Sequence, residues 1–350
     1  MRFKGFALLL VTFSFVALAA EEPKTVGEVL DRAMKLSQLT QPGSAPFHLK
    51  ARVAEIESPD SDYKAEIEEY WVAPDKWRRS IKTPEFSQTM IVNGAQTMEQ
   101  HTGDYYPHWL LNAVIATIDL APAGLPGLNL PYRSMSGMLQ QLAGSSGAVL
   151  SPNSEFCSRS QEQVGIPPVH NSIFTSICFR GNPLLLKSVT SPGYHADFDD
   201  FKKFKGKQAA RRIKVYLEPG TVLDVKIGTL EELQKPDDSM FAVPQATPAR
   251  ARIQRIRAPE EAARAGLLKP PEIVWAPVRD GKTSGSLSIF VSVDKEGKVR
   301  ETWPLNSDNP FPQDQSRKEV MQWRFKPFEV DGVAAQMETV LTFAFQTKRQ

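Results

Sequence analysis

The chain has 350 residues, of which 42 are Lys or Arg and 40 are Asp or Glu, so its formal net charge is +2. Without Arg2 and Lys4, the positive and negative residues balance at 40 each. A formally neutral protein lacks the excess positive charge with which proteins bind nucleic acid, so we expect no nucleic acid partner. The length allows two domains of ordinary size, each able to bury a core.

The first twenty residues have the pattern of an export signal. Arg2 and Lys4 precede an apolar run over residues 6–20, which contains Ala17-Leu-Ala19. A basic start, a short apolar stretch and an Ala-x-Ala site are typical of a secretory signal peptide. The run is short for a spanning helix, which needs about 20 apolar residues. We therefore expect residues 1–19 to be cleaved off and the protein to be periplasmic, with an inner-membrane anchor as the alternative.

Residues 25–244 have the pattern of an antiparallel sheet domain. Thr25-Val-Gly-Glu28 is a capping box, so we expect an opening helix that runs to about Leu39. Strand-like stretches separated by turn residues follow, as in an antiparallel meander. These stretches are Phe47–Ile56, Tyr63–Val72, Trp77–Lys82 and Gln88–Val92, and later Leu184–Val189, Tyr194–Phe201, Arg211–Leu217 and Val222–Leu230.

The interval between the two groups of strands has helix-like patterns. His108–Leu120 is mostly apolar, and Ser134–Leu142 is expected to form a second helix after a loop rich in Gly and Pro. Strands, then helices, then more strands predict the α+β class, with a curved antiparallel sheet that is covered by helices on one face.

A segment early in the predicted meander resembles a known family. Tyr70-Trp-Val-Ala-Pro-Asp-Lys-Trp-Arg-Arg79 reads as a strand, a Pro-containing turn and a strand with an aromatic residue and arginines. Together with the order of elements, it resembles the LolA-like family of periplasmic lipoprotein carriers over about residues 25–244. The resemblance implies a half-barrel whose concave apolar face holds acyl chains or another hydrophobic ligand. An ordinary filled core is the alternative.

Cys157 and Cys178 are the only cysteines in the chain. In an exported protein, two cysteines in one region more often form a disulfide than a metal site. We therefore expect a bridge between them, which would stabilise the fold by roughly 3 kcal/mol.

Residues 245–257 join the two predicted domains. Arg250, Arg252, Arg255 and Arg257 make this stretch locally basic. The pattern predicts a solvated linker or an edge strand, and docking to an acidic partner or an anionic headgroup is the alternative.

Residues 258–350 read as a smaller second domain. Apolar residues alternate with serines over Leu287–Val293, which is the period of a half-buried strand. Asp294-Lys-Glu-Gly297 supplies a turn, since glycine can adopt a positive φ. A short amphipathic helix is expected over about Gln313–Trp323, and alternation over Met337–Phe345 predicts a terminal strand.

The last hundred residues, from about 252 to 350, resemble the C-terminal domain of the TonB family. The matching segments are the turn Val293–Val299, Trp323-Arg-Phe-Lys-Pro327 at the helix end, Asp331-Gly332, and Phe343-Ala-Phe345. The resemblance implies a small antiparallel sheet with short helices that binds a protein partner, by adding a strand of that partner to an exposed edge. The residues that carry this family signature are Asp294, Gly297, Trp323, Phe325, Pro327, Gly332, Phe343 and Phe345. From the residues alone, the large aromatic side chains are expected to be core, because burying each one stabilises by roughly 2–3 kcal/mol.

No arrangement of residues predicts catalysis. The five histidines form neither H-x-x-x-H nor H-E-x-x-H spacing, and no Gly-rich phosphate loop occurs. Gly144-Ser-Ser-Gly147 lacks the spacing of a nucleophile elbow. We therefore expect no enzyme, no metal site and no cofactor.

The sequence thus predicts a periplasmic, non-enzymatic envelope protein of a Gram-negative cell, whose TonB-like domain binds an unidentified envelope or outer-membrane protein in transport. One alternative is a carrier of lipid, lipoprotein or another hydrophobic ligand, which the N-terminal domain would bind. A second alternative is a membrane-anchored TonB-like energy transducer, which would require the first twenty residues to stay attached.

Overall fold

The computed structural model describes residues 32, 35–56, 64–108, 111, 114–118, 148–151, 155–164, 171–181, 183–191, 194–217, 221–243, 253–268, 273–275, 277, 282–308 and 311–350. Side chains are described for most of these residues, but not for residues 148–177.

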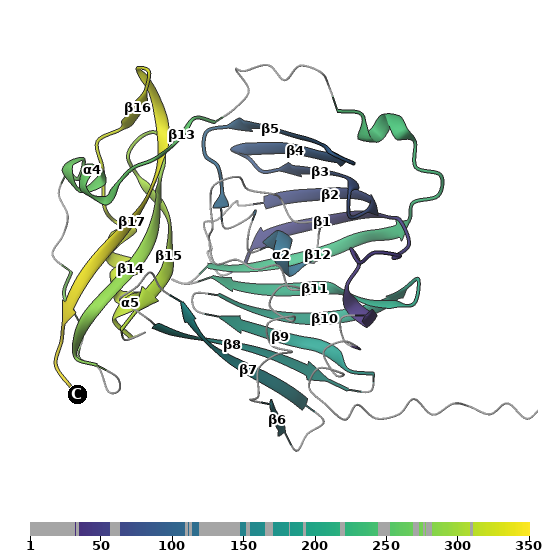
Figure 1. The fold of residues 1–350 in the computed structure, drawn as a ribbon, viewed down its shortest axis with the longest axis horizontal. Coiled ribbons are helices and arrows are strands. Elements are labelled where there is room, and N and C mark those ends of the chain that lie inside the picture. The colour runs from purple at the N-terminus through teal and green to yellow at the C-terminus, as the bar shows by residue number, and fades with distance from the viewer. Residues whose placement is uncertain are drawn as a thin grey trace, which may run out of the picture.

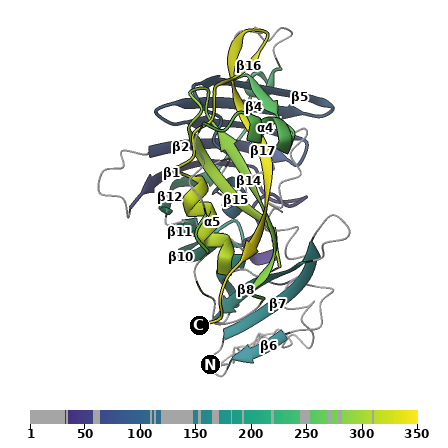
Figure 2. The ribbon, with the colours of Figure 1, turned by 90° about the vertical axis from the view of Figure 1, so that its left-hand side faces the viewer.

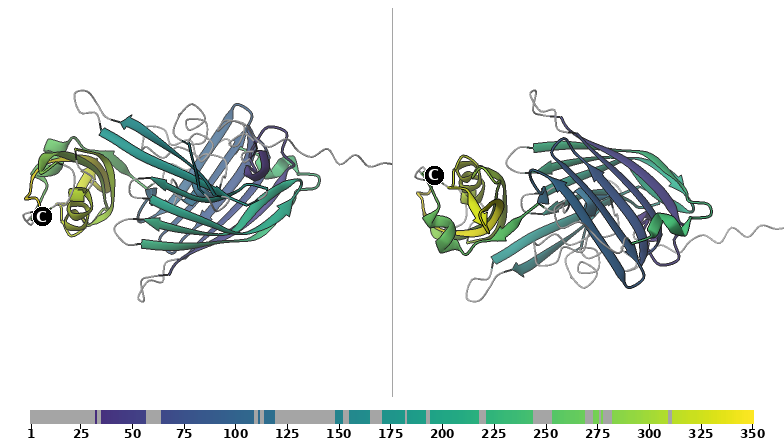
Figure 3. Two further views of the ribbon diagram at one scale, coloured as in Figure 1. Left: turned by 90° about the horizontal axis from the view of Figure 1, so that it is seen from below. Right: turned by 90° about the horizontal axis from the view of Figure 1, so that it is seen from above.

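Twelve strands of the described chain form one large antiparallel sheet (Figure 1). Its order is β5-β4-β3-β2-β1-β12-β11-β10-β9-β8-β7-β6, so the chain meanders outward from β1 to the edge strand β5 and later inward from the opposite edge strand β6 to β12, which pairs with β1. Figure 3 shows that this sheet is strongly twisted and curved. Its strands are β1 (Phe47–Glu55), β2 (Lys64–Ala73), β3 (Lys76–Lys82), β4 (Phe86–Asn93), β5 (Gln96–Gly103), β6 (Ala148–Ser151), β7 (Glu155–Val164), β8 (Asn171–Arg180), β9 (Leu185–Ser191), β10 (Tyr194–Phe204), β11 (Lys207–Leu217) and β12 (Thr221–Glu232).

One face of the large sheet is apolar because side chains alternate along its strands. In β1, the odd-numbered residues from Phe47 to Val53 are buried, whereas Lys50 and Arg52 are exposed. Leu223 and Val225 continue the same apolar face on the neighbouring strand β12. On the opposite face, the 3₁₀ helix η2 (Asp238–Phe241) packs against β3 and β4.

The segment after β5 covers part of the apolar face. Its described residues between His108 and Thr117 are all helical, and they include the short helix α2 (Ile115–Thr117). Tyr106, Leu111, Val114 and Ile115 from this segment belong to the same hydrophobic cluster as the strands below them. The described part of the cover is therefore held on the sheet by buried apolar contacts.

The C-terminal residues form a second, smaller sheet of order β13-β17-β14-β15, to which β16 adds by pairing with β17. β13 runs parallel to β17, and the other pairs are antiparallel. Helix α4 packs against β17 and helix α5 against β15. The elements are β13 (Arg255–Arg257), α4 (Glu260–Ala265), β14 (Ser284–Val293), β15 (Val299–Ser307), α5 (Phe311–Val320), β16 (Phe328–Val330) and β17 (Val333–Gln346).

The turn between β14 and β15 depends on Gly297. Its φ is +84°, and an added Cβ would lie 2.0 Å from the carbonyl oxygen of Phe325. The Asp294 carboxylate closes the turn by accepting the backbone N–H groups of Glu296 at 3.1 Å and Lys298 at 2.8 Å. Position 297 therefore tolerates no side chain.

The small sheet stands across the ends of the large sheet's strands (Figures 1 and 2). Phe290 of β14 and Trp303 of β15 are buried in the hydrophobic cluster of the large sheet. The other face of the small sheet has its own core, in which Leu287, Met337 and Leu341 pack with residues of the two helices. The two sheets are thus in direct apolar contact.

The predicted α+β class is wrong, because the chain is mostly β. Within the predicted helical interval His108–Leu120, every described residue from His108 to Thr117 is helical, so one short helical segment is present there. Residues 148–180 contribute the strands β6, β7 and β8, which extend the sheet instead of interrupting it. No layer of helices covers the large sheet in the described residues.

Several predictions fall outside the described residues: the signal peptide at 1–19, most of the opening helix, the helix at Ser134–Leu142, and residues 245–252 of the linker. Residues 255–257 of the predicted linker form the edge strand β13. Among the helices described, none combines the length and apolarity that crossing a membrane would require.

Candidate ligand-binding site between the two sheets

The residues that follow β5 contact the small sheet and so join the large sheet to it. Tyr105, Tyr106 and His108 are all buried there. They meet the face of the small sheet that is turned away from its own core, where polar side chains such as Ser292 are buried too. Buried polar groups are costly unless they are paired, so each hydrogen bond at this junction matters for stability.

The Tyr105 hydroxyl donates to the Glu301 carboxylate at 2.7 Å and lies 2.9 Å from the Ser292 hydroxyl. Burial raises the pKa of Tyr105 well above its usual value, and the negative charge of Glu301 raises it further. Tyr105 is therefore a neutral donor at the junction. Glu301 also accepts the backbone N–H of His108 at 3.0 Å.

The Gln336 side chain of β17 fixes the backbone of Tyr106. Its carbonyl oxygen accepts the Tyr106 N–H at 2.7 Å, and its amide nitrogen donates to the Tyr106 carbonyl at 3.1 Å and to Ser292 at 3.0 Å. An amide that both donates to and accepts from one backbone unit sets its orientation.

His108 and Glu338 form a buried pair, with His108 Nε2 2.8 Å from Glu338 Oε1. Burial by itself raises the pKa of Glu338, but the hydrogen bond from His108 and the charges of His108, Arg255 and Arg257 lower it below the usual value. The carboxylate is therefore the acceptor and His108 Nε2–H the donor.

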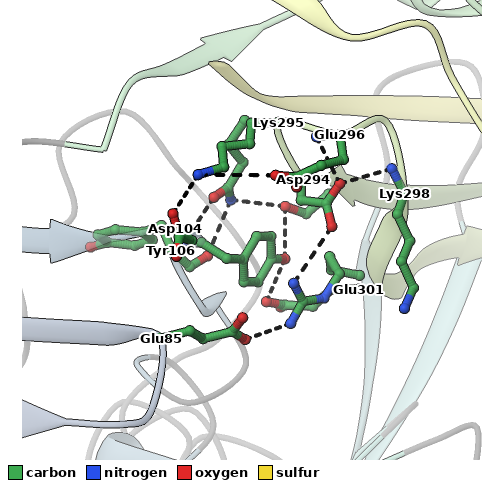
Figure 4. A network of polar contacts seen from close by, with 12 residues as sticks. Glu85, Asp104, Tyr106, Asp294, Lys295, Glu296, Lys298 and Glu301 are labelled. Carbon is green, nitrogen blue, oxygen red and sulfur yellow. Dashed lines mark hydrogen bonds and ion pairs between the residues drawn. The ribbon is translucent and has the colours of Figure 1, made fainter. Parts of the chain in front are cut away.

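Charged residues surround this buried centre (Figure 4). Lys295 in the β14–β15 turn pairs with Asp104, and Arg300 of β15 pairs with Glu85 in the β3–β4 connection. Although burial lowers the pKa of Arg300, its hydrogen bond to Glu85 raises it overall. Both ion pairs join the large sheet's loops to the small sheet.

A cavity of about 200 Å³ lies at this junction, and we call it the junction cavity. Its apolar lining includes Leu217 and Leu223 of the large sheet and Trp303 of the small sheet, which all belong to the large sheet's hydrophobic cluster. Its charged lining residues are Glu55, Glu85, Arg300 and Glu301. A concave, mostly apolar space with a few convergent polar groups is the usual form of a small-molecule site.

A second cavity, of about 50 Å³, lies on the apolar face of the large sheet. It is lined by Ile213 and Ile227 from the strands and by Ile118 from the covering segment, together with Phe198. The cover and the sheet are therefore not completely packed against each other at this point. The described residues hold no group of three or more His, Cys, Asp or Glu side chains arranged for a metal ion.

The residues predicted from the TonB resemblance all lie in the smaller sheet's unit, and none of them lines the junction cavity. Half of them are core residues, and the others lie in turns or loops. The core residues are Trp323, Phe325, Phe343 and Phe345, and the turn or loop residues are Asp294, Gly297, Pro327 and Gly332. Pro327 is exposed. Their positions account for the fold of this unit rather than for a binding surface.

The two cysteines are brought together by the sheet. Cys157 on β7 and Cys178 on β8 are directly opposite in the antiparallel register. This juxtaposition is what a bridge between neighbouring strands needs, and the disulfide itself stays a prediction.

The residues of the junction were not predicted. Tyr105, Glu301, Gln336 and Glu338 have no motif around them, and their partners are distant in the sequence. The one local signal is the alternation over Met337–Phe345, which predicted the strand but not what its polar side faces. A polar strand face that docks on another sheet has the same alternation as a solvated one.

No protein-family model matches the chain, and no curated protein matches it. The resemblance to TonB therefore gains no support from these comparisons.

Solved structures that are similar to the chain are LolA-superfamily, DUF1329 and lipoprotein-sorting domains. One, described as an outer membrane lipoprotein-sorting protein domain from Vibrio parahaemolyticus, shares 8% identity and a TM-score of 0.33, over 61% of this chain and 95% of that one. A DUF1329 family protein from Desulfovibrio piger shares 9% identity and a TM-score of 0.35, over 62% and 95%. A LolA superfamily protein from Nitrosomonas europaea shares 10% identity and a TM-score of 0.29, over 63% and 98%. Similarity at this level carries no argument about function.

Proposed function

We propose that the protein is a periplasmic, non-enzymatic carrier of an apolar ligand of the acyl-chain class, which binds to the apolar face of the large sheet. The observation that carries this proposal is the junction cavity. Its apolar lining includes Leu217 and Leu223, which are core residues of the large sheet, so a ligand in the cavity would be in contact with the sheet's apolar face.

The size of the cavity limits what it can hold. About 200 Å³ is less than the roughly 300–1,000 Å³ of pockets that enclose whole drug-sized molecules. The cavity therefore suits one end of a chain. Because protein cores are close-packed, the rest of a long chain must displace part of the cover over residues 105–118.

Binding a protein partner by strand addition is not favoured by the edges of the small sheet. On β17, Glu260 accepts the Thr342 N–H at 2.9 Å, and Arg264 donates to the Thr342 carbonyl at 2.7 Å. On the outer strand β15, buried Arg317 donates to the Thr302 carbonyl at 3.1 Å. An added strand would have to displace these side chains, which protect the edges in the way that natural sheets protect theirs.

The periplasmic part of the proposal rests on the export pattern of residues 1–19. The Cys157–Cys178 bridge belongs to the same proposal, because disulfides persist in that oxidising compartment.

The proposal is tested by filling the junction cavity. Thr221 lines the cavity at the start of β12, whereas Thr229 lies further along β12 opposite Lys50 and does not line it. Thr221→Phe is expected to weaken saturable binding of a fluorescent long-chain acyl probe by about tenfold, since overpacking costs roughly 1–3 kcal/mol. Thr229→Phe is the matched control and should bind as the wild type does. Equal binding by both variants, with unchanged urea midpoints, would contradict a ligand in this cavity.

A further inference from the structure

A buried ion pair lies on the apolar face of the large sheet. Glu69 on β2 is directly opposite Arg79 on β3, and Arg79 Nε lies 2.7 Å from Glu69 Oε2. The two side chains are 0% and 1% exposed. By the alternation of the strands, they share a face with Trp71 and Trp77, and the Arg79 guanidinium carbon lies 4.9 Å from the centroid of the Trp77 ring.

This patch has N–H donors without acceptors. Within the part of the chain that the structure describes, Nη1 and Nη2 of Arg79 are buried and have no hydrogen-bond partner, and the same holds for Nε1 of Trp71. Trp71 pairs with Trp77 in the row next to the Glu69–Arg79 pair. Native proteins pair the great majority of their buried polar groups, and an unpaired donor in an apolar setting is costly. Donors gathered in this way indicate an acceptor that binds there.

The charge of the patch selects the kind of acceptor. Glu69 already neutralises the guanidinium of Arg79. A ligand carboxylate or phosphate would add a second negative charge in a buried setting, and an uncompensated buried charge is strongly unfavourable. A neutral carbonyl oxygen would accept from the guanidinium without adding charge.

We infer that Arg79 and Trp71 form a subsite for the carbonyl oxygen of an acyl ester or amide, so that the ligand is an acylated molecule rather than a free fatty acid. This inference rests on the proposed function, because it assumes an acyl ligand on the same face. Along β3, Arg79 is four residues from Thr83, which lines the junction cavity. That separation is about 13 Å along a strand, so a ligand that reaches both places must be elongated.

The test compares a glycerol monoester with the glycerol monoether of the same chain length, because the two differ by the ester carbonyl. Their affinities are measured by competition with a fluorescent acyl probe on the full protein. The wild type is expected to prefer the ester by about tenfold, since hydrogen bonds from a charged donor are among the stronger ones. The free fatty acid of that length is expected to bind more weakly than the ester.

Two variants assign the preference to Arg79. Arg79→Lys keeps a cation beside Glu69 but loses the planar fork, and its ester preference should fall towards one. Glu69→Leu with Arg79→Leu removes both charges together, so that no buried charge is left alone. This double variant should bind the ether as the wild type does and show no ester preference. Arg78→Leu removes the neighbouring arginine, whose side chain points to the opposite face and reaches the Met240 carbonyl, and should keep the preference.

The outcomes separate the subsite from the proposed function. Equal binding of ester and ether by the wild type would overturn the subsite and leave the acyl carrier standing. An ester preference that survives in the double variant would also overturn it. Failure of both compounds to bind would overturn the proposed function itself.

Discussion

At the scale of single residues, the two sheets are joined by buried polar side chains. Because they are buried, these side chains cannot hydrogen-bond to water if they lose their partner. His108 and Glu338 are 0% and 6% exposed, and they are 2.8 Å apart. Breaking such a pair leaves one buried polar group unsatisfied, which costs more than the net gain from forming it. The junction is therefore sensitive to changes in charge.

Glu338→Gln should destabilise the protein in a pH-dependent way. The folded pKa of Glu338 is lowered below its usual value of 4.5, so its contribution is complete above that value and is lost as the pH falls through the folded pKa. At neutral pH, the variant is expected to lose about 2 kcal/mol of unfolding free energy. The loss should shrink below about pH 4.5. Urea unfolding across this range measures it.

Glu329→Gln is the matched control, because Glu329 is exposed on the short strand β16. It should change the unfolding free energy little at any pH. A loss in Glu338→Gln that stayed constant from neutral to acid pH would contradict the role of the ionised carboxylate.

Trp323→Ala should strongly destabilise the unit of the small sheet. Trp323 is 3% exposed and packs edge-on against Phe343, with ring centroids 5.8 Å apart. Truncating a buried Trp usually costs about 3–5 kcal/mol. Chemical denaturation of the full protein measures the loss, and Val333→Ala, at a 53% exposed position, is the control. Unchanged stability in Trp323→Ala would assign the side chain to a binding surface instead.

At the scale of elements, strands with a clear period of two could be predicted. Phe47–Ile56 was predicted and β1 is Phe47–Glu55; Val222–Leu230 was predicted and β12 is Thr221–Glu232. In such strands, the buried face alone sets the pattern. Strand β5 (Gln96–Gly103) was missed because Met98 is its one strongly apolar residue. Its place in the sheet comes from pairing with β4, which no local pattern reports.

The candidate site could not be predicted for the same reason. The Tyr105 hydroxyl meets a carboxylate 196 residues away, and the Tyr106 backbone meets Gln336, 230 residues away. Ordinary tyrosine and glutamate residues become a site only when the two sheets meet. The turn around Gly297 could be predicted, because its positive φ is a local requirement.

The pairing of β7 with β8 supports the prediction of a disulfide between Cys157 and Cys178. Cys157 and Cys178 face each other across these strands, so the exported protein is expected to have no thiol that reacts with an alkylating reagent before reduction. Replacing both cysteines by serine should cost roughly 3 kcal/mol, because the closed loop then opens in the unfolded chain. Mass spectrometry after alkylation, with and without reductant, measures the bridge. Two free thiols in the unreduced protein would contradict it.

At the scale of the whole molecule, the small sheet closes the strand ends of the large one. The two sheets share apolar contacts through Phe290 and Trp303, and polar contacts through residues 104–108. Arginine side chains of the small sheet's own helices bind backbone carbonyls of β17 and of the outer strand β15. This arrangement favours a unit that completes a ligand site over one that offers a free edge to a partner.

The most direct test of this account is native mass spectrometry with lipid extraction on the mature protein, purified from its own periplasm. We expect a bound acyl species, and the extracted lipid should be an ester or amide. A ligand-free mass together with a co-purifying outer-membrane protein would contradict the acyl carrier and return the function to the small sheet.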